Sequence, residues 1–130
     1  LLKDFSDFEI DIFDAEESKK FWSDVNNLAF LKNMQGDLWR ISVRPTDGIQ
    51  IIKKLDPKAS YLDWSGGLVW LRVEEGFNVR EKMQKMSGHA MCLSGTFNQF
   101  HPISTIEKTL STSIRKKFDP KMLFNQQVLN

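Results

Sequence analysis

Alternation of apolar and polar positions predicts two clear β-strands in the middle of the chain. The run 38-LWRISVR-44 has one apolar side and one mixed side, and residues 68–74 repeat the pattern. The apolar positions are Trp39, Ile41 and Val43 in the first run and Val69, Leu71 and Val73 in the second. The mixed side carries Arg40, Ser42, Arg44, Trp70 and Arg72. Because successive side chains of a strand point to opposite faces, each strand should bury one face and leave the other open.

Helical spacing of apolar residues alternates with strand-like runs along the rest of the chain. Helices are predicted over residues 15–31, from Pro45 to Leu55, over about 78–87 and over 103–118. Shorter strands are predicted over residues 8–13, 60–64 and 89–93. Asp14 suits the N-cap of the first helix, and Gly66-Gly67 suits a tight reversal between two strands.

Each predicted helix has an apolar stripe that should face the core. The stripes are Phe21, Val25, Leu28 and Ala29; Ile49, Ile52 and Leu55; Val79, Met83 and Met86; and Ile106, Leu110, Ile114 and Phe118. The basic residues Arg115, Lys116 and Lys117 suit the negative C-terminal end of the last helix.

The order of the predicted elements indicates a known arrangement. From residue 37 to residue 93 it is strand–helix–strand–strand–helix–strand, which is the split βαβ, ferredoxin-like unit. Both helices then cover one face of an antiparallel sheet whose first and third strands are central. The expected fold class is therefore α+β, with an N-terminal strand and helix before this unit and a C-terminal helix and tail over residues 103–130.

Length and composition narrow the possible classes of protein. The 130 residues suit one domain with its own core, and the net charge of +1 gives no reason to expect a nucleic acid or another polyanion as partner. A single cysteine, Cys92, excludes an internal disulfide and favours a reducing compartment. No apolar run reaches the roughly 20 residues that span a bilayer. Because the chain opens on Leu1 and not on Met, we expect it to be a fragment of a longer protein.

Few residues suit catalysis. His89 and His101 are not at ligand spacing from another metal-binding residue, so no metal site is expected. Cys92 lies in an apolar strand, where a small buried hydrophobe is a better interpretation than a nucleophile. The sequence has no Gly-rich phosphate-binding motif. It therefore does not predict a self-sufficient active site.

The sheet face without helices is the more informative surface. Its three arginines and Trp70 could bind a carboxylate or a phosphate, because guanidinium offers a bidentate fork and indole a flat wall. A solvated face in which arginine stems cover the tryptophan is the alternative. A nucleic-acid module would use the same residues for stacking, but the central strand lacks the aromatic pattern of such modules. A pure subunit-contact surface is a third alternative.

Five motifs occur in order along the chain. They are 21-FWSDVNNLAF-30, 39-WRISVRP-45, 63-DWSGGLVWL-71, 88-GHA-90 and 118-FDPKMLFN-125. Together they resemble the C-terminal part of the FAD-binding subunit of glycolate oxidase, a flavoprotein of the vanillyl-alcohol-oxidase type. The sequence departs from that family at Val69, where the family has arginine, at Met91, where it has threonine, and at 126–128, where it has Pro-Gly-Arg. These departures indicate a divergent member, whose substrate could differ from glycolate.

The resemblance implies a role for the whole chain. Residues 1–130 would be the cap, or substrate, domain of a longer subunit, and FAD would be bound mainly by a domain upstream. The complex would oxidise a small 2-hydroxy acid such as glycolate to the 2-oxo acid, as in glyoxylate metabolism. Its other members would be a related flavin subunit and an iron–sulfur subunit. The fragment alone would be inactive, and the complex cytoplasmic with peripheral membrane association.

The resemblance also gives the sheet face a purpose, because the family's cap lays its sheet over the flavin ring. The candidate substrate- or flavin-facing residues are Arg40, Trp39, Trp64, Trp70, Arg72, His89 and Asn125. We expect Arg40 to bind the substrate and Arg72 to be a second anion contact. Trp39 and Trp64 are expected to form the pocket wall. His89 is a flavin or substrate contact in one interpretation and a structural turn residue in the other. No catalytic residue is assigned to this chain.

Overall fold

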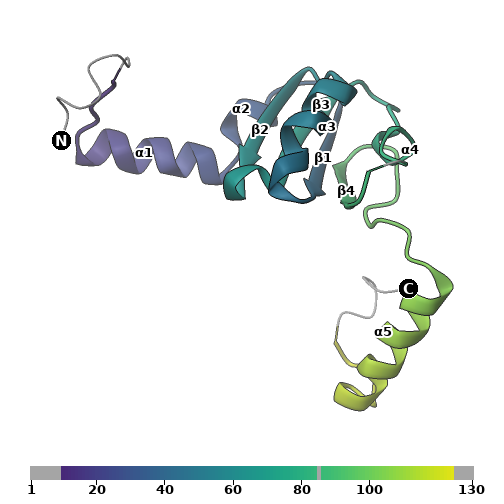
Figure 1. The fold of residues 1–130 in the computed structure, drawn as a ribbon. Helices are drawn as coiled ribbons and strands as arrows, with labels where there is room; N and C mark the ends of the chain where they lie inside the picture. Colours follow the sequence, from purple (N-terminus) through teal and green to yellow (C-terminus); the bar gives the residue numbers. More distant parts are fainter. Residues whose placement is uncertain (1–9, 85, 125–130) are drawn as a thin grey trace. The chain divides into compact units, whose positions relative to one another are not determined.

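The computed structural model describes residues 10–84 and 86–124. The chain divides into two compact units, Leu1–Gln99 and Phe100–Asn130. The first contains a four-stranded antiparallel sheet with several helices, which confirms the predicted α+β class (Figure 1). The second contains one long helix.

From β1 (Asp37–Ser42) to β4 (His89–Ser94) the strands and the α-helices between them follow the predicted order. The helices and strands of the first unit are α1 (Ala15–Asn26), α2 (Ala29–Lys32), β1 (Asp37–Ser42), the 3-10 turn η2 (Pro45–Asp47), α3 (Gly48–Leu55), β2 (Ala59–Asp63), the 3-10 turn η3 (Trp64–Gly66), β3 (Leu68–Val73), α4 (Val79–Lys82) and β4 (His89–Ser94). The second unit contains α5 (Thr105–Phe118). The strand expected over residues 8–13 is absent from its described part, residues 10–13, and residues 8 and 9 lie outside the described chain.

The sheet has the strand order β2-β3-β1-β4, with every neighbouring pair antiparallel. This is the ferredoxin-like order, and it confirms that the first and third strands are central. In the register of β1 and β3, Trp39 pairs with Leu71 and Arg40 pairs with Trp70. Side chains that pair directly across strands share a face, so this register fixes which residues can meet.

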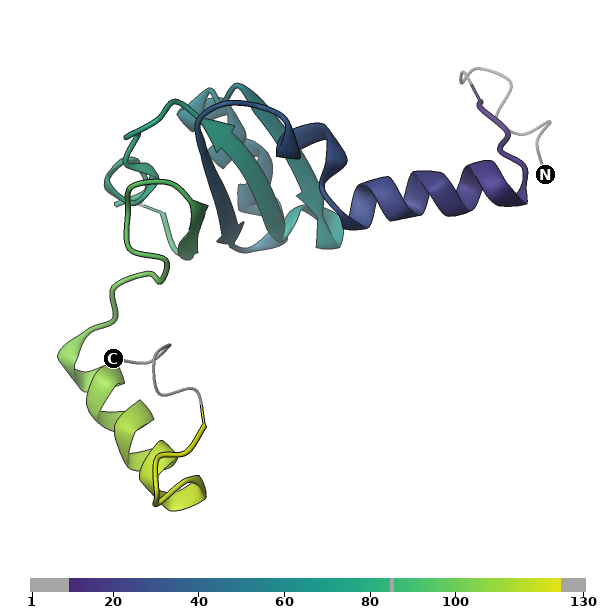
Figure 2. The same cartoon turned by 180° about the vertical axis from the view of Figure 1, so that it is seen from behind.

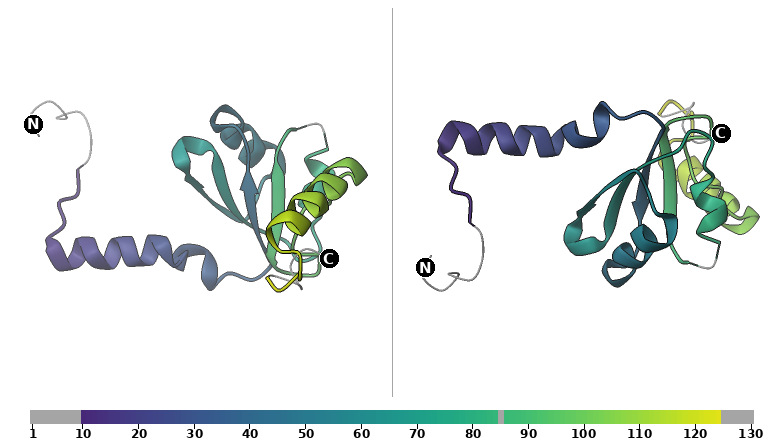
Figure 3. Two further views of the ribbon diagram at one scale, coloured as in Figure 1. Left: turned by 90° about the horizontal axis from the view of Figure 1, so that it is seen from below. Right: turned by 90° about the horizontal axis from the view of Figure 1, so that it is seen from above.

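The core lies between one face of the sheet and the two crossover helices. Trp39, Ile41, Val69 and Leu71 are fully buried there, as their alternation predicted. They pack in one cluster with Ile51 and Leu55 of α3, with Val79 of α4, and with Met83. Figure 3 shows α3 and α4 on the same side of the sheet. Truncating a central member such as Leu71 to alanine would cost about 2–5 kcal/mol, because it removes buried apolar area and leaves a cavity.

The buried stripe of α3 differs from the prediction. Gly48, Ile51 and Leu55 face the core, while Ile49 is 53% exposed and Ile52 is half-buried. Gly48 sets this rotation, because a Cβ there would lie 2.1 Å from the carbonyl oxygen of Gly66. Because glycine has no Cβ, the start of α3 can approach the β2–β3 connection closely. This approach places Gly48 on the inner side of the helix and Ile49 on the outer side.

The predicted helix over residues 78–87 is much shorter in the structure. Asn78 caps α4 by accepting the backbone N–H of Glu81 at 3.3 Å. After Lys82 the helix gives way to a turn, in which the N–H of Met86 donates to the carbonyl of Met83. Met83 still reaches the core, so the apolar spacing was predicted correctly although the helix length was not.

The predicted N-terminal helix is divided in two. Asp14 caps α1 as expected, in a capping box with Glu17 whose two hydrogen bonds measure 2.8 and 3.0 Å. Leu28 then adopts a left-handed conformation with φ 52°, which separates α1 from α2. No residue of α1 is buried, whereas Leu31 of α2 is 1% exposed. The break therefore redirects the chain so that Leu31 is buried within the first unit.

Arg80 fixes the loop after β4. Its Nε donates to the carbonyl of Ala90 at 3.0 Å, and its Nη2 donates to the carbonyls of Asn98 and Gln99 at 2.7 and 3.0 Å. The N–H of Cys92 in β4 also donates to Gln99, at 3.0 Å. These contacts hold residues 98–99 beside the outer edge of β4.

In the second unit a tight backbone hook follows α5. Ser104 and Glu107 form a capping box at the start of α5. After the helix, the carboxylate of Asp119 accepts the N–H groups of Leu123 and Phe124, both at 2.9 Å. The predicted stripe of α5 is present, but its members Ile106, Leu110, Ile114 and Phe118 are exposed in the described structure.

Candidate anion-binding face of the sheet

A row of four side chains crosses the sheet on the face opposite α3, which Figure 2 views from the front. Tyr61 pairs with Trp70, Trp70 pairs with Arg40, and Arg40 pairs with Met91, so the row runs from β2 to β4. The indole of Trp64, from η3, approaches the same arginine. We call Tyr61, Trp64, Trp70, Arg40 and Met91 the open face.

Arg40 is at the centre of the open face. Its guanidinium carbon lies 5.7 Å from the ring centroid of Trp64 and 5.6 Å from that of Trp70. Each such contact contributes about 0.5–1 kcal/mol or more as solvent is excluded. Nη1 also approaches the sulfur of Met91 at 4.0 Å, and a thioether is only a weak acceptor. No carboxylate or carbonyl of the described residues pairs with this half-buried guanidinium, which leaves donors for a ligand.

Trp64 is held over Arg40 by an unusual backbone. Trp64, Ser65 and Gly66 all have left-handed conformations, with φ of 51°, 54° and 95°. For a residue with a side chain this conformation costs roughly 1–2 kcal/mol. The carboxylate of Asp63 accepts the N–H of Trp64 at 2.7 Å, which helps to offset that cost. Trp64 remains 63% exposed, so η3 positions an aromatic residue at the surface instead of burying it. Trp64 thus lies just beyond β2, not within the strand predicted over 60–64.

Arg72 is not available as a second anion contact, which corrects the prediction. It is 5% exposed, and Nε and Nη2 donate to the carbonyl of Leu31 at 3.0 and 2.6 Å. Nη1 donates to the carbonyl of Gly36 at 3.0 Å. Phe30 of α2 also contacts Tyr61, with ring centroids 5.7 Å apart. The face expected to be free of helices is therefore covered by α2 at the Arg72 end.

Trp39 is a core residue and not part of a pocket wall, which corrects its predicted role. It is fully buried, with the guanidinium of Arg80 5.0 Å from its ring centroid and the ring of Phe97 5.5 Å away. Its alternation with Arg40 already placed it on the covered side of β1. Within the described residues its Nε1–H has no hydrogen-bond partner.

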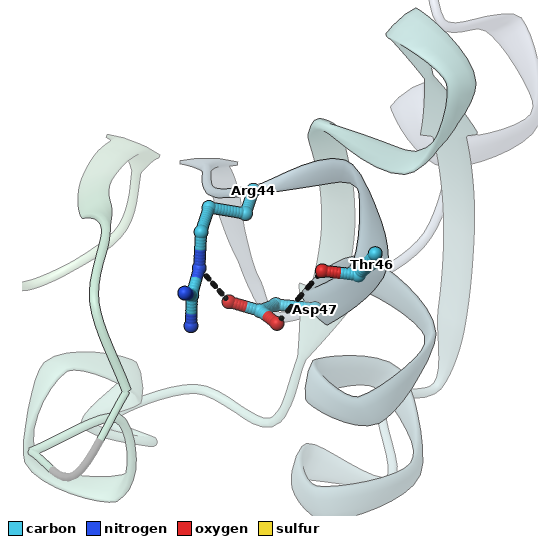
Figure 4. A network of polar contacts seen from close by, with 3 residues as sticks. All are labelled: Arg44, Thr46 and Asp47. Atoms are coloured by element: carbon cyan, nitrogen blue, oxygen red, sulfur yellow. Dashed lines mark hydrogen bonds and ion pairs between the residues drawn. The ribbon is translucent and has the colours of Figure 1, made fainter.

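Arg44 also lies away from the open face, because β1 ends at Ser42. Figure 4 shows its Nε paired with a carboxylate oxygen of Asp47 at 2.9 Å, while the other oxygen accepts from Thr46 at 3.2 Å. The Arg44 side chain is 74% exposed, so this ion pair contributes little stability.

The remaining candidates lie near the open face or outside the described chain. His89 is the first residue of β4 and is exposed. It pairs with Ser42, two residues along β1 from Arg40, so it lies on the same face in the neighbouring row. Asn125 lies outside the described residues. Tyr61 and Met91 were missed as site residues, because their place beside Trp70 and Arg40 depends on the pairing of the edge strands. The alternation in β1 and β3 alone could not identify them.

The structure offers few other chemical groups. Cys92 is 4% exposed, and burial raises the pKa of its thiol, so the reactive thiolate is disfavoured. In residues 10–84 and 86–124, no three His, Cys, Asp or Glu side chains gather as metal ligands. None of the helices in the described part of the chain has the length and apolarity needed to cross a bilayer.

The open face is thus the described surface that best suits a ligand. It combines two indoles, a thioether and a guanidinium that has no acidic partner among residues 10–84 and 86–124. Comparisons of the chain with protein-family models, with curated proteins and with solved structures found no match.

Proposed function

We propose that this chain is the cap domain of an FAD-dependent oxidoreductase of 2-hydroxy acids, with the open face covering the flavin site. The observation that carries the proposal is the environment of Arg40. Its guanidinium lies over two indoles and has no acidic partner among the described residues. Such a cation suits an anionic ligand supplied from outside the domain.

A carboxylate matches the free donors of Arg40. The planar guanidinium can donate two parallel N–H bonds to the two carboxylate oxygens, and such charge-assisted bonds are about twice as strong as neutral ones. Trp64 and Trp70 restrict the orientation of the guanidinium and exclude water from its faces. Arg40 would thereby fix the position of the α-carbon that carries the hydroxyl, which is the main contribution that a cap makes to rate.

The residues also fit a flavin ring, although not the whole cofactor. Trp64 presents an exposed indole next to a guanidinium, which is a flat surface of the kind that covers an aromatic heterocycle. The chain has no Gly-rich loop for a pyrophosphate, so the dinucleotide half needs another domain. When bound, FAD would accept the two electrons removed from the hydroxy acid. A related flavin subunit, an iron–sulfur subunit and a cytoplasmic location belong to this proposal.

Flavin reduction tests the proposal. The complete gene product would be purified with its partners and mixed anaerobically with 2-hydroxy acids, and bleaching of the flavin absorption would be followed. Arg40→Gln should raise KM about 10- to 100-fold, because it removes a charge-assisted bidentate contact. Arg44→Gln is the matched control and should leave KM unchanged, because Arg44 lies off the open face. A preparation without flavin, or unaltered kinetics in Arg40→Gln, would refute the proposal.

The open face also favours a second candidate, a sheet that stacks single-stranded RNA. Tyr61 and Trp70 stand side by side on β2 and β3 of a ferredoxin-like sheet, and Trp64 is exposed near them. Aromatic rings in such positions stack bases. A gel shift with single-stranded RNA that weakens as salt rises, and that Trp64→Ala abolishes, would favour this candidate over the oxidoreductase.

A further inference from the structure

We infer that the open face selects 2-hydroxy acids with an apolar side chain over glycolate, and that Met91 is the specificity-determining residue. The inference rests on the proposed function and deepens it. It starts from the position of Met91, whose sulfur lies 4.0 Å from Nη1 of Arg40. Because Arg40 and Met91 pair directly across β1 and β4, their side chains share one face of the sheet.

The groups around the guanidinium are largely apolar, apart from one N–H donor on each indole. Two indoles and one thioether contact it, and these three side chains supply no carboxylate and no hydroxyl. The neighbouring rows of the same face lie two residues along β1 in each direction, with Ser42 and His89 in one row and Leu38 and Arg72 in the other. Two residues along a strand correspond to about 7 Å, which is beyond direct contact with the same carboxylate.

This arrangement determines what a bound carboxylate meets next. When both carboxylate oxygens of a 2-hydroxy acid accept N–H bonds from Arg40, the α-carbon of the acid lies beside the Met91 side chain and the indole faces. A methylene group attached there gains about fourfold in affinity if it is fully buried, and about two- to threefold on a surface that buries it in part. A polar substituent would lose water at this position, and the indole faces and the thioether would give it only weak hydrogen bonds in return. The side chain of methionine is flexible and polarizable, so it adapts to unbranched chains of different length.

Two variants of Met91 separate apolar contact from simple bulk. Met91→Leu keeps an apolar side chain of similar volume, whereas Met91→Gln keeps the length and replaces the thioether by an amide. Met91 is half-buried in β4, so either variant should leave the fully buried core undisturbed. Urea unfolding of each variant would check that it folds before any ligand is added.

The test measures ligand binding without flavin. The 130-residue chain would be titrated with glycolate, lactate, 2-hydroxybutyrate and 2-hydroxyhexanoate, and binding followed by tryptophan fluorescence and by the NMR signal of the Arg40 Nε–H. Kd should fall two- to fourfold per added methylene in the wild type and in Met91→Leu. In Met91→Gln the Kd values should become nearly equal across the series. Arg40→Gln should abolish binding of all four acids, because it removes the carboxylate contact.

The possible failures point to different steps. Equal Kd values across the series in the wild type would overturn the inference and leave Arg40 as a carboxylate site. A dependence on chain length that persists in Met91→Gln would overturn the role of Met91. Absence of binding to the chain, or binding that survives Arg40→Gln, would also overturn the inference. The flavin-reduction assay decides the proposed function separately, because its readout does not depend on how the acids rank.

Discussion

Replacing Arg72 by methionine should destabilise the first unit strongly without affecting carboxylate binding. Arg72 is 5% exposed and donates three hydrogen bonds, two to the carbonyl of Leu31 and one to that of Gly36. Methionine keeps the apolar stem but removes all five donors. The change therefore isolates the hydrogen bonds that join α2 to the sheet.

The magnitude follows from what the substitution leaves behind. The carbonyl oxygens of Leu31 and Gly36 lose their guanidinium donors, and the Leu31 carbonyl keeps only the N–H of Met34, at 3.4 Å. A buried carbonyl without a good hydrogen bond costs about 1–3 kcal/mol. Removing the guanidinium also relieves its desolvation, which offsets part of this cost. We therefore expect the free energy of unfolding to fall by about 2–4 kcal/mol, a large fraction of the roughly 5–15 kcal/mol of a typical domain.

Urea unfolding followed by circular dichroism measures this loss, and hydrogen exchange locates it. The amides of α2 should lose protection first, because Leu31 is held through Arg72. Arg44→Met is the matched control, since Arg44 is 74% exposed, and it should change the free energy of unfolding by less than about 0.5 kcal/mol. A loss below about 1 kcal/mol in Arg72→Met, or unchanged protection of α2, would refute the structural role of Arg72.

Three further predictions concern other sites. Gly48→Ala should lower the free energy of unfolding in urea by about 1–3 kcal/mol, because the new Cβ would meet the backbone oxygen of Gly66. Gly67→Ala should lower it less, because no atom lies closer than 3.3 Å to a Cβ at that position. Hydrogen bonds from the backbone N–H groups of Phe124 and Leu123 lower the pKa of Asp119 in the folded chain. The hook that Asp119 holds should therefore be fully stable above the carboxyl pKa of the unfolded chain, which is near 4. It should open as the pH falls through the lower pKa of the folded chain. An NMR pH titration of those amides measures this, and Asp119→Asn should abolish the transition. Burial raises the pKa of Cys92, so a thiol reagent at neutral pH should react slowly with the folded chain and rapidly in urea; fast reaction with the folded chain would contradict its burial.

The strand faces could be predicted from the sequence because they depend on a local pattern. Alternation in two short runs correctly placed Trp39 and Leu71 in the core, and Arg40 and Trp70 on the opposite face. The order of helices and strands was enough to predict the strand order of the sheet. Predicting these features requires only two rules: how side chains alternate along a strand or repeat along a helix, and that the crossover helices cover one face of the sheet.

Contacts between distant segments could not be predicted in this way. Nothing in the strand around Arg72 indicates that its donors bind a carbonyl 41 residues earlier. The sequence of α3 allows either Ile49 or Ile51 to face the core. The close approach of Gly48 to the β2–β3 connection turns Ile51 inward and Ile49 outward. The sequence also does not predict the left-handed backbone at Trp64, because tryptophan has no preference for that conformation. Each case depends on packing that only the assembled fold provides.

The loop held by Arg80 has a consequence for aggregation. An edge strand exposes unpaired backbone groups, and a second molecule can add a strand to it. On β4, the N–H of Cys92 and the carbonyl of Ala90 are both occupied, by Gln99 and by Arg80 itself. Because Arg80 also binds the carbonyls of residues 98 and 99, one side chain both fixes the loop and caps the strand. Arg80 thus makes this end of the sheet a poor template for strand addition by a second molecule.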